Sequence, residues 1–130
     1  MSYADTIRIV GPLNSGDAAG GAGTATANDD SSIVVRGLVL GFYIRYNDSP
    51  PAATTDVTIA TSGNSTPGYT LLTITDAATD GLFLVRDNAV DTAGVSQASV
   101  WELIPVHDNL NVKIAQANNG DSVDVWALVV

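Results

Sequence analysis

The last twenty-one residues of the chain constrain its fold most strongly. Residues 110–130 contain two runs of alternating apolar side chains, separated by Asn119-Gly120. Asn-Gly is a strong signal for a two-residue type I′ turn, because that turn needs positive φ at both central residues. The predicted register pairs Leu110 with Val129, Val112 with Ala127, Ile114 with Val125, Gln116 with Val123 and Asn118 with Asp121. A slip of one residue would expose the apolar set, so pattern and turn together predict a β-hairpin with one buried face.

The rest of the chain also has the pattern of short strands. Strands are expected at residues 6–10 (ending at Gly11-Pro12), 33–46, 56–61, 69–75, 82–85 and 100–106, with a polar loop at residues 87–98. In the longest run, the even positions Val34, Leu38, Leu40, Phe42, Ile44 and Tyr46 are expected to face the core. That run is expected to bend or break at Gly37 or Gly41. No segment has a helical period, which predicts an all-β, single-domain β-sandwich or jelly-roll-like barrel.

Residues 14–32 consist almost entirely of Gly, Ala, Ser, Thr, Asn and Asp. Such a stretch buries little apolar surface, so it predicts an extended arm or loop within the same domain, before a sandwich core at residues 33–130. Residues 24–27 could form a strand inside it. An arm held against its own sheet and an arm held against a neighbouring subunit both remain open.

Charge and composition exclude several functions. The formal net charge is −9, with only five Lys and Arg, so there is no basic surface for nucleic acid or for an anionic membrane. The chain has no Cys, and hence no disulfide or thiolate nucleophile. No apolar run approaches a membrane span and no signal-peptide pattern opens the chain, so a soluble protein made in the cytoplasm is expected.

No residue pattern predicts catalysis or a cofactor. His107 is the only histidine, and Asp108 beside it would point to the other side of a strand, which disfavours a hydrolase. The Asp-rich turns at residues 28–30 and 76–80 have donors for calcium, but turn formation explains them better and no metal site is predicted. Trp101 and Trp126 could stack on sugar rings, although core or interface packing is the favoured interpretation.

Three segments of the chain carry a family likeness. They are residues 37–47 (GLVLGFYIRYN), residues 50–61 (PPAATTDVTIAT) and, towards the C-terminus, residues 105–107 with 111–117 (PVH and NVKIAQA). This pattern of strand and turn residues resembles small capsid decoration, or cement, proteins of tailed bacteriophages, over roughly residues 33–130. The resemblance implies a non-enzymatic β-sandwich without cofactors.

Such a protein would bind the outside of an expanded phage head as a homodimer or homotrimer, with the major capsid protein as its partner. Its location would be the exterior of the virion, assembled in the host cytoplasm. Anchor residues are expected among apolar and aromatic side chains, and the candidates are Tyr3, Ile7, Leu13, Trp101 and Trp126. The alternative is a carbohydrate- or receptor-binding β-sandwich of a phage fibre or tail, which two tryptophans exposed in one concave patch would favour.

Overall fold

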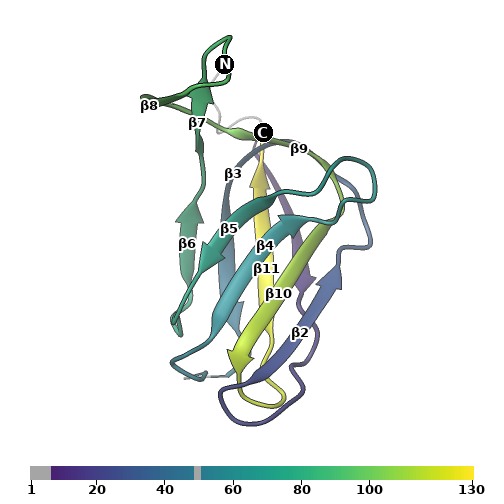
Figure 1. The fold of residues 1–130 in the computed structure, drawn as a ribbon. Coiled ribbons are helices and arrows are strands. Elements are labelled where there is room, and N and C mark those ends of the chain that lie inside the picture. Colours follow the sequence, from purple (N-terminus) through teal and green to yellow (C-terminus); the bar gives the residue numbers. More distant parts are fainter. Residues whose placement is uncertain (1–6, 49–50) are drawn as a thin grey trace.

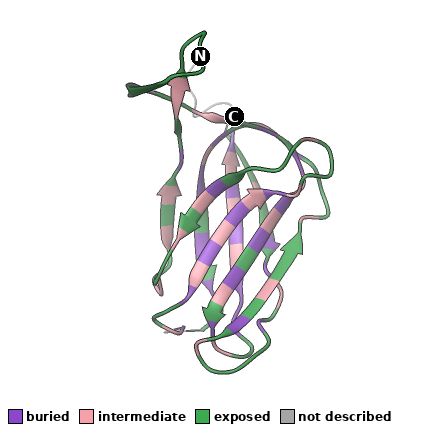
Figure 2. Ribbon diagram, viewed as in Figure 1, coloured by how far each residue is buried: buried purple, intermediate pink, exposed green. Residues whose placement is uncertain are grey.

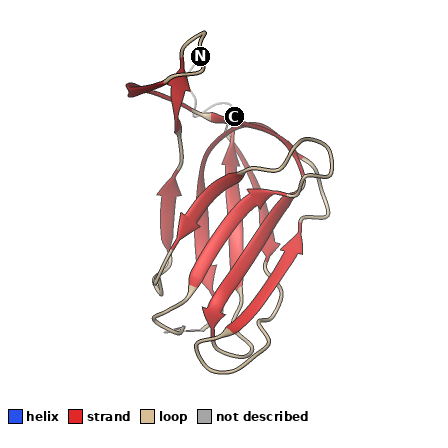
Figure 3. Ribbon diagram, in the orientation of Figure 1, coloured by secondary structure: helices blue, strands red, loops and turns tan. Residues whose placement is uncertain are grey.

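The computed structural model describes residues 7–48 and 51–130, and this part of the chain contains strands but no helix (Figure 3). The strands in the first half are β1 (Arg8–Asn14), β2 (Ala25–Asp30), β3 (Val35–Tyr46), β4 (Asp56–Thr61) and β5 (Thr70–Ile74). The second half contributes β6 (Gly81–Leu84), β7 (Asp87–Val90), β8 (Ser96–Glu102), β9 (Ile104–Asp108), β10 (Leu110–Ala117) and β11 (Val123–Val129). The prediction of an all-β chain is confirmed.

The strands form two antiparallel sheets that pack face to face (Figure 1). The first sheet has the order β1-β11-β3-β6, and β9 also pairs with β3. The second sheet has the order β2-β10-β4-β5. Strands β7 and β8 form a separate hairpin that projects beyond one end of the sandwich, next to β6 (Figure 1). This arrangement is a β-sandwich rather than a closed barrel.

Buried residues alternate with more exposed ones along the central strands of both sheets, and the buried ones make up the core (Figure 2). In β11 every second residue from Val123 to Val129 is fully buried, and β10 shows the same alternation from Leu110 to Ile114. Phe42 and Ile44 of β3 complete the centre of the core. Period-two alternation with one buried face is the pattern expected of each sheet in a sandwich.

The predicted hairpin at the C-terminus is wrong, although its strands and its buried face are right. Strand β10 pairs with β2 and β4, whereas β11 pairs with β1 and β3, so the chain crosses from one sheet to the other. We call residues 118–122, which make this crossing, the arch. In a hairpin the buried faces of β10 and β11 would lie side by side in one sheet. In this fold they face each other across the core, and alternation alone does not distinguish the two arrangements.

The arch keeps a tight turn of a different type. The N–H of Asp121 donates to the carbonyl of Asn118 at 3.1 Å, and Gly120 has a φ of +87° while Asn119 has no positive φ. A type I′ turn needs positive φ at both positions, so this turn does not continue into a hairpin. The arch is tied instead to the β1–β2 loop, because Gly120 N–H donates to the Ala18 carbonyl at 2.7 Å.

Strand β3 bends where the sequence predicts it. Its register with β11 shifts between Val39 and Gly41, and the buried phase changes at the same point. Val35 and Val39 are buried before the shift, and the even positions from Phe42 onward are buried after it. The expectation that Val34 and Leu38 face the core is therefore wrong, and both are exposed. Beyond this bulge β3 pairs with β6, and before it with β9.

The Gly- and Ala-rich region is built into the sandwich over residues 8–30. Strand β1 continues through Gly11-Pro12 with a bulge and forms an edge of the first sheet, and β2 forms an edge of the second. The loop between them is held to β2 by Ala19, which exchanges two backbone hydrogen bonds with Thr26. Of the two possibilities that the sequence left open, these residues are held against their own sheets.

The segment from residue 81 to residue 108 differs most from the sequence prediction. The buried strand expected at residues 82–85 is right for one face only, because Phe83 packs against the core and Val85 is buried, whereas Leu82 and Leu84 are exposed. The expected polar loop at residues 87–98 contains the β7–β8 hairpin, whose turn closes with a hydrogen bond from Gly94 N–H to the Asp91 carbonyl at 3.0 Å. The expected strand at residues 100–106 is divided at Leu103 between β8 and β9.

Candidate functional site

The outward side of the first sheet carries an unusual set of large apolar side chains. We call Ile9, Tyr43, Leu82, Leu84, Trp126 and Leu128 the apolar outer face. Strand register places them in two rows, one from Trp126 through Tyr43 to Leu82 and one from Ile9 through Leu128 towards Leu84. Ile9 and Leu84 are the most exposed, at 70% and 73%. A contiguous apolar surface of this kind usually marks an interaction site.

Two glycines give these side chains room to lie close to the sheet. A Cβ atom on Gly11 would lie 3.2 Å from Cδ1 of the Trp126 indole. A Cβ atom on Gly41 would lie 3.2 Å from Cδ2 of Leu84. Glycine within a strand often marks such a close approach, so both residues shape the outer face as well as the backbone.

Trp126 is the centre of the apolar outer face. Its ring meets that of Tyr43 edge to face, with centroids 5.9 Å apart, and the guanidinium of Arg45 lies 4.9 Å from its centroid. Together with Ile9, Leu82 and Leu128, the two aromatic rings line a shallow groove of about 370 Å³. An aromatic side chain locked by its neighbours makes a good anchor for a partner, because little conformational entropy is lost on binding.

A polar row closes one end of the apolar outer face. Arg45 Nη2 lies 3.1 Å from Asp124 Oδ2, and Asn14 Nδ2 donates to Asp124 Oδ1 at 2.7 Å. The three side chains follow the register of β1, β11 and β3. An apolar centre with a polar, hydrogen-bonded rim is the usual anatomy of a protein interface.

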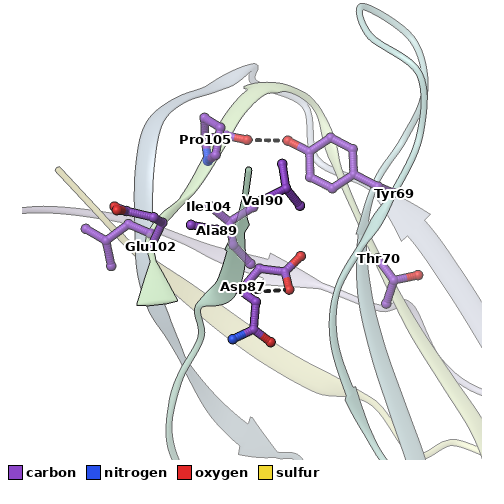
Figure 4. Close-up of a pocket in the computed structure, with 10 residues that line it drawn as sticks. Tyr69, Thr70, Asp87, Ala89, Val90, Glu102, Ile104 and Pro105 are labelled. Carbon is purple, nitrogen blue, oxygen red and sulfur yellow. Dashed lines mark hydrogen bonds between the residues drawn. The ribbon is translucent and has the colours of Figure 1, made fainter. Parts of the chain in front are cut away.

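A second hollow, of about 560 Å³, lies between the β7–β8 hairpin, β9 and the start of β5 (Figure 4). Its lining includes Tyr69, Val90, Ile104 and the carboxylates of Asp87 and Glu102, which are opposite each other in the hairpin register. The Tyr69 hydroxyl donates to the carbonyl of Pro105 across its mouth (Figure 4). Burial, with a contribution from nearby Asp108, raises the pKa of Tyr69, so its hydroxyl remains a proton donor at neutral pH.

Asp108 is the most heavily hydrogen-bonded carboxylate of the protein's described part. It is buried and accepts from the N–H groups of Gly63, Ser65 and Asn109 at 2.8–3.1 Å. The hydroxyls of Ser62 and Thr66 donate to it as well. Burial by itself would raise the pKa of Asp108, but these hydrogen bonds outweigh it and lower the pKa to about 2. Asp108 therefore organises the β4–β5 loop and carries no proton at neutral pH.

His107 and Asp108, the one pair that the sequence analysis weighed for hydrolysis, lie on opposite sides of β9. His107 is exposed and Asp108 is buried, as alternation predicts. Over residues 7–48 and 51–130 no three His, Cys, Asp or Glu side chains gather as metal ligands. The same residues contain no helix with the length and hydropathy that crossing a bilayer requires.

The sequence-predicted anchor residues do not form one site. Tyr3 lies outside the described residues, and Leu13 is buried in the core at 7% exposure, so Leu13 has no surface to offer a partner. Ile7 is exposed just before β1. Trp101 is half exposed on β8, where Arg86 stacks 5.5 Å from its ring centroid, and it shares no hollow with Trp126.

Sequence reasoning found Trp126 but missed its partners on the apolar outer face. The available signal was the run from residue 126 to residue 130, WALVV, which is apolar at both phases of the strand. Such a run indicates a strand that needs cover on both sides. No comparable signal indicated that Leu82 and Leu84 of β6 belong to this face, and both were assigned to the core.

No protein-family model, curated protein or solved structure matches this chain.

Proposed function

We propose that this chain is a structural virion protein that binds the outer surface of a mature tailed-phage capsid and stabilises it. The proposal takes its class from the resemblance of residues 37–61 and 105–117 to capsid decoration proteins. Its partners would be the major capsid protein and further copies of itself, in a dimer or trimer. No enzymatic step is part of the role.

The apolar outer face is the single observation that best supports this role. It exposes Ile9, Leu82 and Leu84 on the outer side of the first sheet, with Trp126 and Tyr43 as pre-arranged aromatic anchors. A decoration protein binds many equivalent positions on a lattice, so moderate affinity at each is enough when the protein is oligomeric. An apolar surface spread over four strands, with a polar rim, suits broad contact with another protein better than capture of a small molecule.

The fibre or tail interpretation has less support. That interpretation predicts two tryptophans exposed in one concave patch, whereas Trp101 lies on the projecting hairpin and Trp126 on the first sheet. The groove beside Trp126 is lined by apolar and aromatic side chains only, which leaves few partners for sugar hydroxyls.

Co-sedimentation with phage heads tests the proposal. The purified protein is mixed with expanded heads stripped of their outer proteins, with unexpanded proheads as the control. We expect saturable binding to expanded heads only, together with a higher melting temperature of the heads. Absence of binding to either form would refute the proposal and would direct the search to glycan arrays.

Matched variants then test the surface. The double variant I9S/L84S removes two highly exposed side chains of the apolar outer face, and V95S removes an equally apolar, exposed side chain of the β7–β8 turn. Interface anchors cost more than about 1 kcal/mol each on truncation, so I9S/L84S should weaken binding by about tenfold or more. V95S should bind like the wild type. Equal binding by all three proteins would exclude the apolar outer face as the docking surface.

A further inference from the structure

Strand β6 forms an open edge of the first sheet. It pairs with β3 along one side only, and it is the outermost strand on its side of the sandwich (Figure 1). The N–H of Val85 donates to the Leu40 carbonyl at 2.9 Å, which fixes the direction of the backbone groups around it. These directions alternate along a strand, so the N–H and C=O groups of Leu82 and Leu84 point away from β3. They face the side on which the described part of the chain has no further strand.

The edge of β6 lacks the features that normally discourage pairing with another chain. Proline interrupts the β1 edge at Pro12, and Asp29 and Asp30 place charges on the β2 edge. Strand β6 consists of Gly81-Leu82-Phe83-Leu84, which contains neither a charge nor a proline. Sheets usually protect an exposed edge with such residues, and an unprotected apolar edge readily accepts another strand. Strand β6 is therefore suited to pairing with a second chain.

The sequence around β6 is complementary to itself. Asp80 precedes the strand and Arg86 lies just beyond its other end, and both side chains are exposed. Two copies of β6 paired antiparallel about Phe83 would place Asp80 of one copy opposite Arg86 of the other. Leu82 would then be opposite Leu84, and both lie on the outer side of the sheet. Opposite charges and apolar pairs at facing positions each stabilise an antiparallel pair of strands.

The same register also uses the free backbone groups. It brings Leu82 of one copy opposite Leu84 of the other, and the N–H and C=O groups of both point toward the partner. Two facing residues of this kind exchange two hydrogen bonds. A register shifted by one residue would lose these bonds, and a register shifted by two would separate Asp80 from Arg86. Backbone direction and charge therefore favour one register.

Both charged residues are available for this contact. Asp80 accepts from the N–H of Tyr46 through Oδ1 at 2.9 Å, which leaves Oδ2 for a second donor. The guanidinium of Arg86 lies 5.5 Å from the ring centroid of Trp101, and it forms no ion pair within the part of the chain that the structure describes. The β5 edge is uncharged as well, but residues 62–79 contain no Lys or Arg that could make a matching contact. Charge complementarity thus favours β6 over β5.

We infer that β6 pairs with β6 of a second copy of this chain, about a two-fold axis at Phe83, and that this contact forms a dimer. The axis is perpendicular to the sheet, so the two apolar outer faces lie on the same side and join into one surface. Such a dimer would bind a lattice through two linked sites. The inference deepens the self-association named in the proposed function and rests on it for the use of the dimer on a capsid, whereas the contact itself is tested without phage heads.

Sedimentation velocity of the free protein, at concentrations up to about 0.1 mM, tests the dimer. The wild type should shift from the mass of one chain to that of two and no further, because a two-fold contact is closed. R86E places like charges opposite each other at both ends of the contact, so it should raise the dissociation constant by about tenfold. K113E makes the same change of charge at an exposed position of β10 and should dimerise like the wild type.

A proline at position 84 tests the backbone contact. The N–H that L84P removes points away from β3, so the pairing of β6 with β3 is kept and the partner loses a donor. L84P should fold, as judged by circular dichroism, and remain monomeric. If L84P does not fold, the comparison of R86E with K113E still decides the question.

Single cysteines test the register. The natural chain has no Cys, so L82C and L84C each carry one thiol. In the inferred register residue 82 of one copy is opposite residue 84 of the other, with Cα atoms about 5.5 Å apart, a spacing that suits a disulfide. A mixture of the two variants should therefore form a mixed disulfide on oxidation, whereas each variant alone should stay largely uncrosslinked.

Four results would overturn the inference. They are a wild type that stays monomeric over the whole series, a trimer or larger assembly, a wild-type dimer constant in both R86E and folded L84P, and crosslinking of either single variant as fast as that of the mixture. A dimer with the expected variant effects that does not bind phage heads would support the inference and count against the proposed function alone.

Discussion

A pair of engineered cysteines tests the arrangement of β10 more sharply than any single substitution. Thr58 of β4 and Lys113 of β10 are directly opposite each other in the second sheet, on its outer side. Opposite residues of antiparallel strands have Cα atoms about 4.5 or 5.5 Å apart, and both spacings suit a disulfide. The natural chain has no Cys, so T58C/K113C contains a single possible pair. We expect it to oxidise readily.

The loop closed by this bond sets the size of the effect. It spans about 55 residues, for which the loss of chain entropy in the unfolded state gives about 4 kcal/mol at 25 °C. A domain of 130 residues has an unfolding entropy of roughly 270 cal/mol/K near its midpoint, so this corresponds to a rise of about 15 °C in melting temperature. Strain in the bond would reduce both values. Calorimetry of the oxidised and reduced forms of the same protein measures the difference.

The control is the pair that a C-terminal hairpin would bring together. In that register Lys113 is opposite Trp126, whereas in the sandwich the two side chains point outward from opposite sheets. Packed sheets are about 10 Å apart, far beyond the Cβ spacing of about 4 Å in a disulfide. K113C/W126C should therefore keep two free thiols under the same oxidation. A disulfide in K113C/W126C and free thiols in T58C/K113C would refute the two-sheet arrangement.

Two further predictions concern stability. Folding lowers the pKa of Asp108 from 3.8 to about 2, so as the pH falls this carboxylate is protonated in the unfolded chain before it is protonated in the folded one. The stability that ionised Asp108 gives the fold is therefore complete above about pH 4 and is lost as the pH approaches 2. Acid titration followed by circular dichroism should show this loss of stability in the wild type. D108N should be less stable, and its stability should depend less on pH over the same range. Gly37 has a φ of +129° and a Cβ there would collide with the Val130 carbonyl, so G37A should destabilise the fold by about 1–3 kcal/mol in urea unfolding. A neutral G37A would contradict the docking of residue 130 on Leu38, with which it exchanges two backbone hydrogen bonds.

Strand positions could be predicted from the sequence wherever alternation had one clear phase. The range of β4 is predicted without error, and β10 and β11 fall within a residue or two of their predicted ends. What alternation cannot give is the partner of each strand. The same buried face serves a hairpin in one sheet and an arch between two, and the arch has a contact between Gly120 and Ala18, which lie far apart in the sequence.

The buried side was assigned wrongly where a strand changes the side that it turns to the core. In β3 the bulge before Gly41 moves the buried side from odd to even positions, and only the even positions after it were assigned correctly. The glycine predicted a bend but not its effect on the residues before it. At residues 82–85 all four apolar side chains were assigned to the core, because a short continuous apolar run is typical of a buried strand, whereas only Phe83 and Val85 lie on the core side.

The apolar outer face could not be predicted as a surface because it joins four strands from distant parts of the sequence. Along β11 its outward residues change from Asp124 to Trp126 and Leu128, so the outer side of one strand passes from polar to apolar. The neighbouring strands change in the same direction, from Asn14 to Ile9 and from Arg45 to Tyr43. On a surface that binds nothing, there is no reason for the outward side chains of three strands to change from polar to apolar in the same direction. Their agreement is what an interface with a second protein would require, and this is why the apolar outer face, rather than either tryptophan alone, is the place to test for capsid binding.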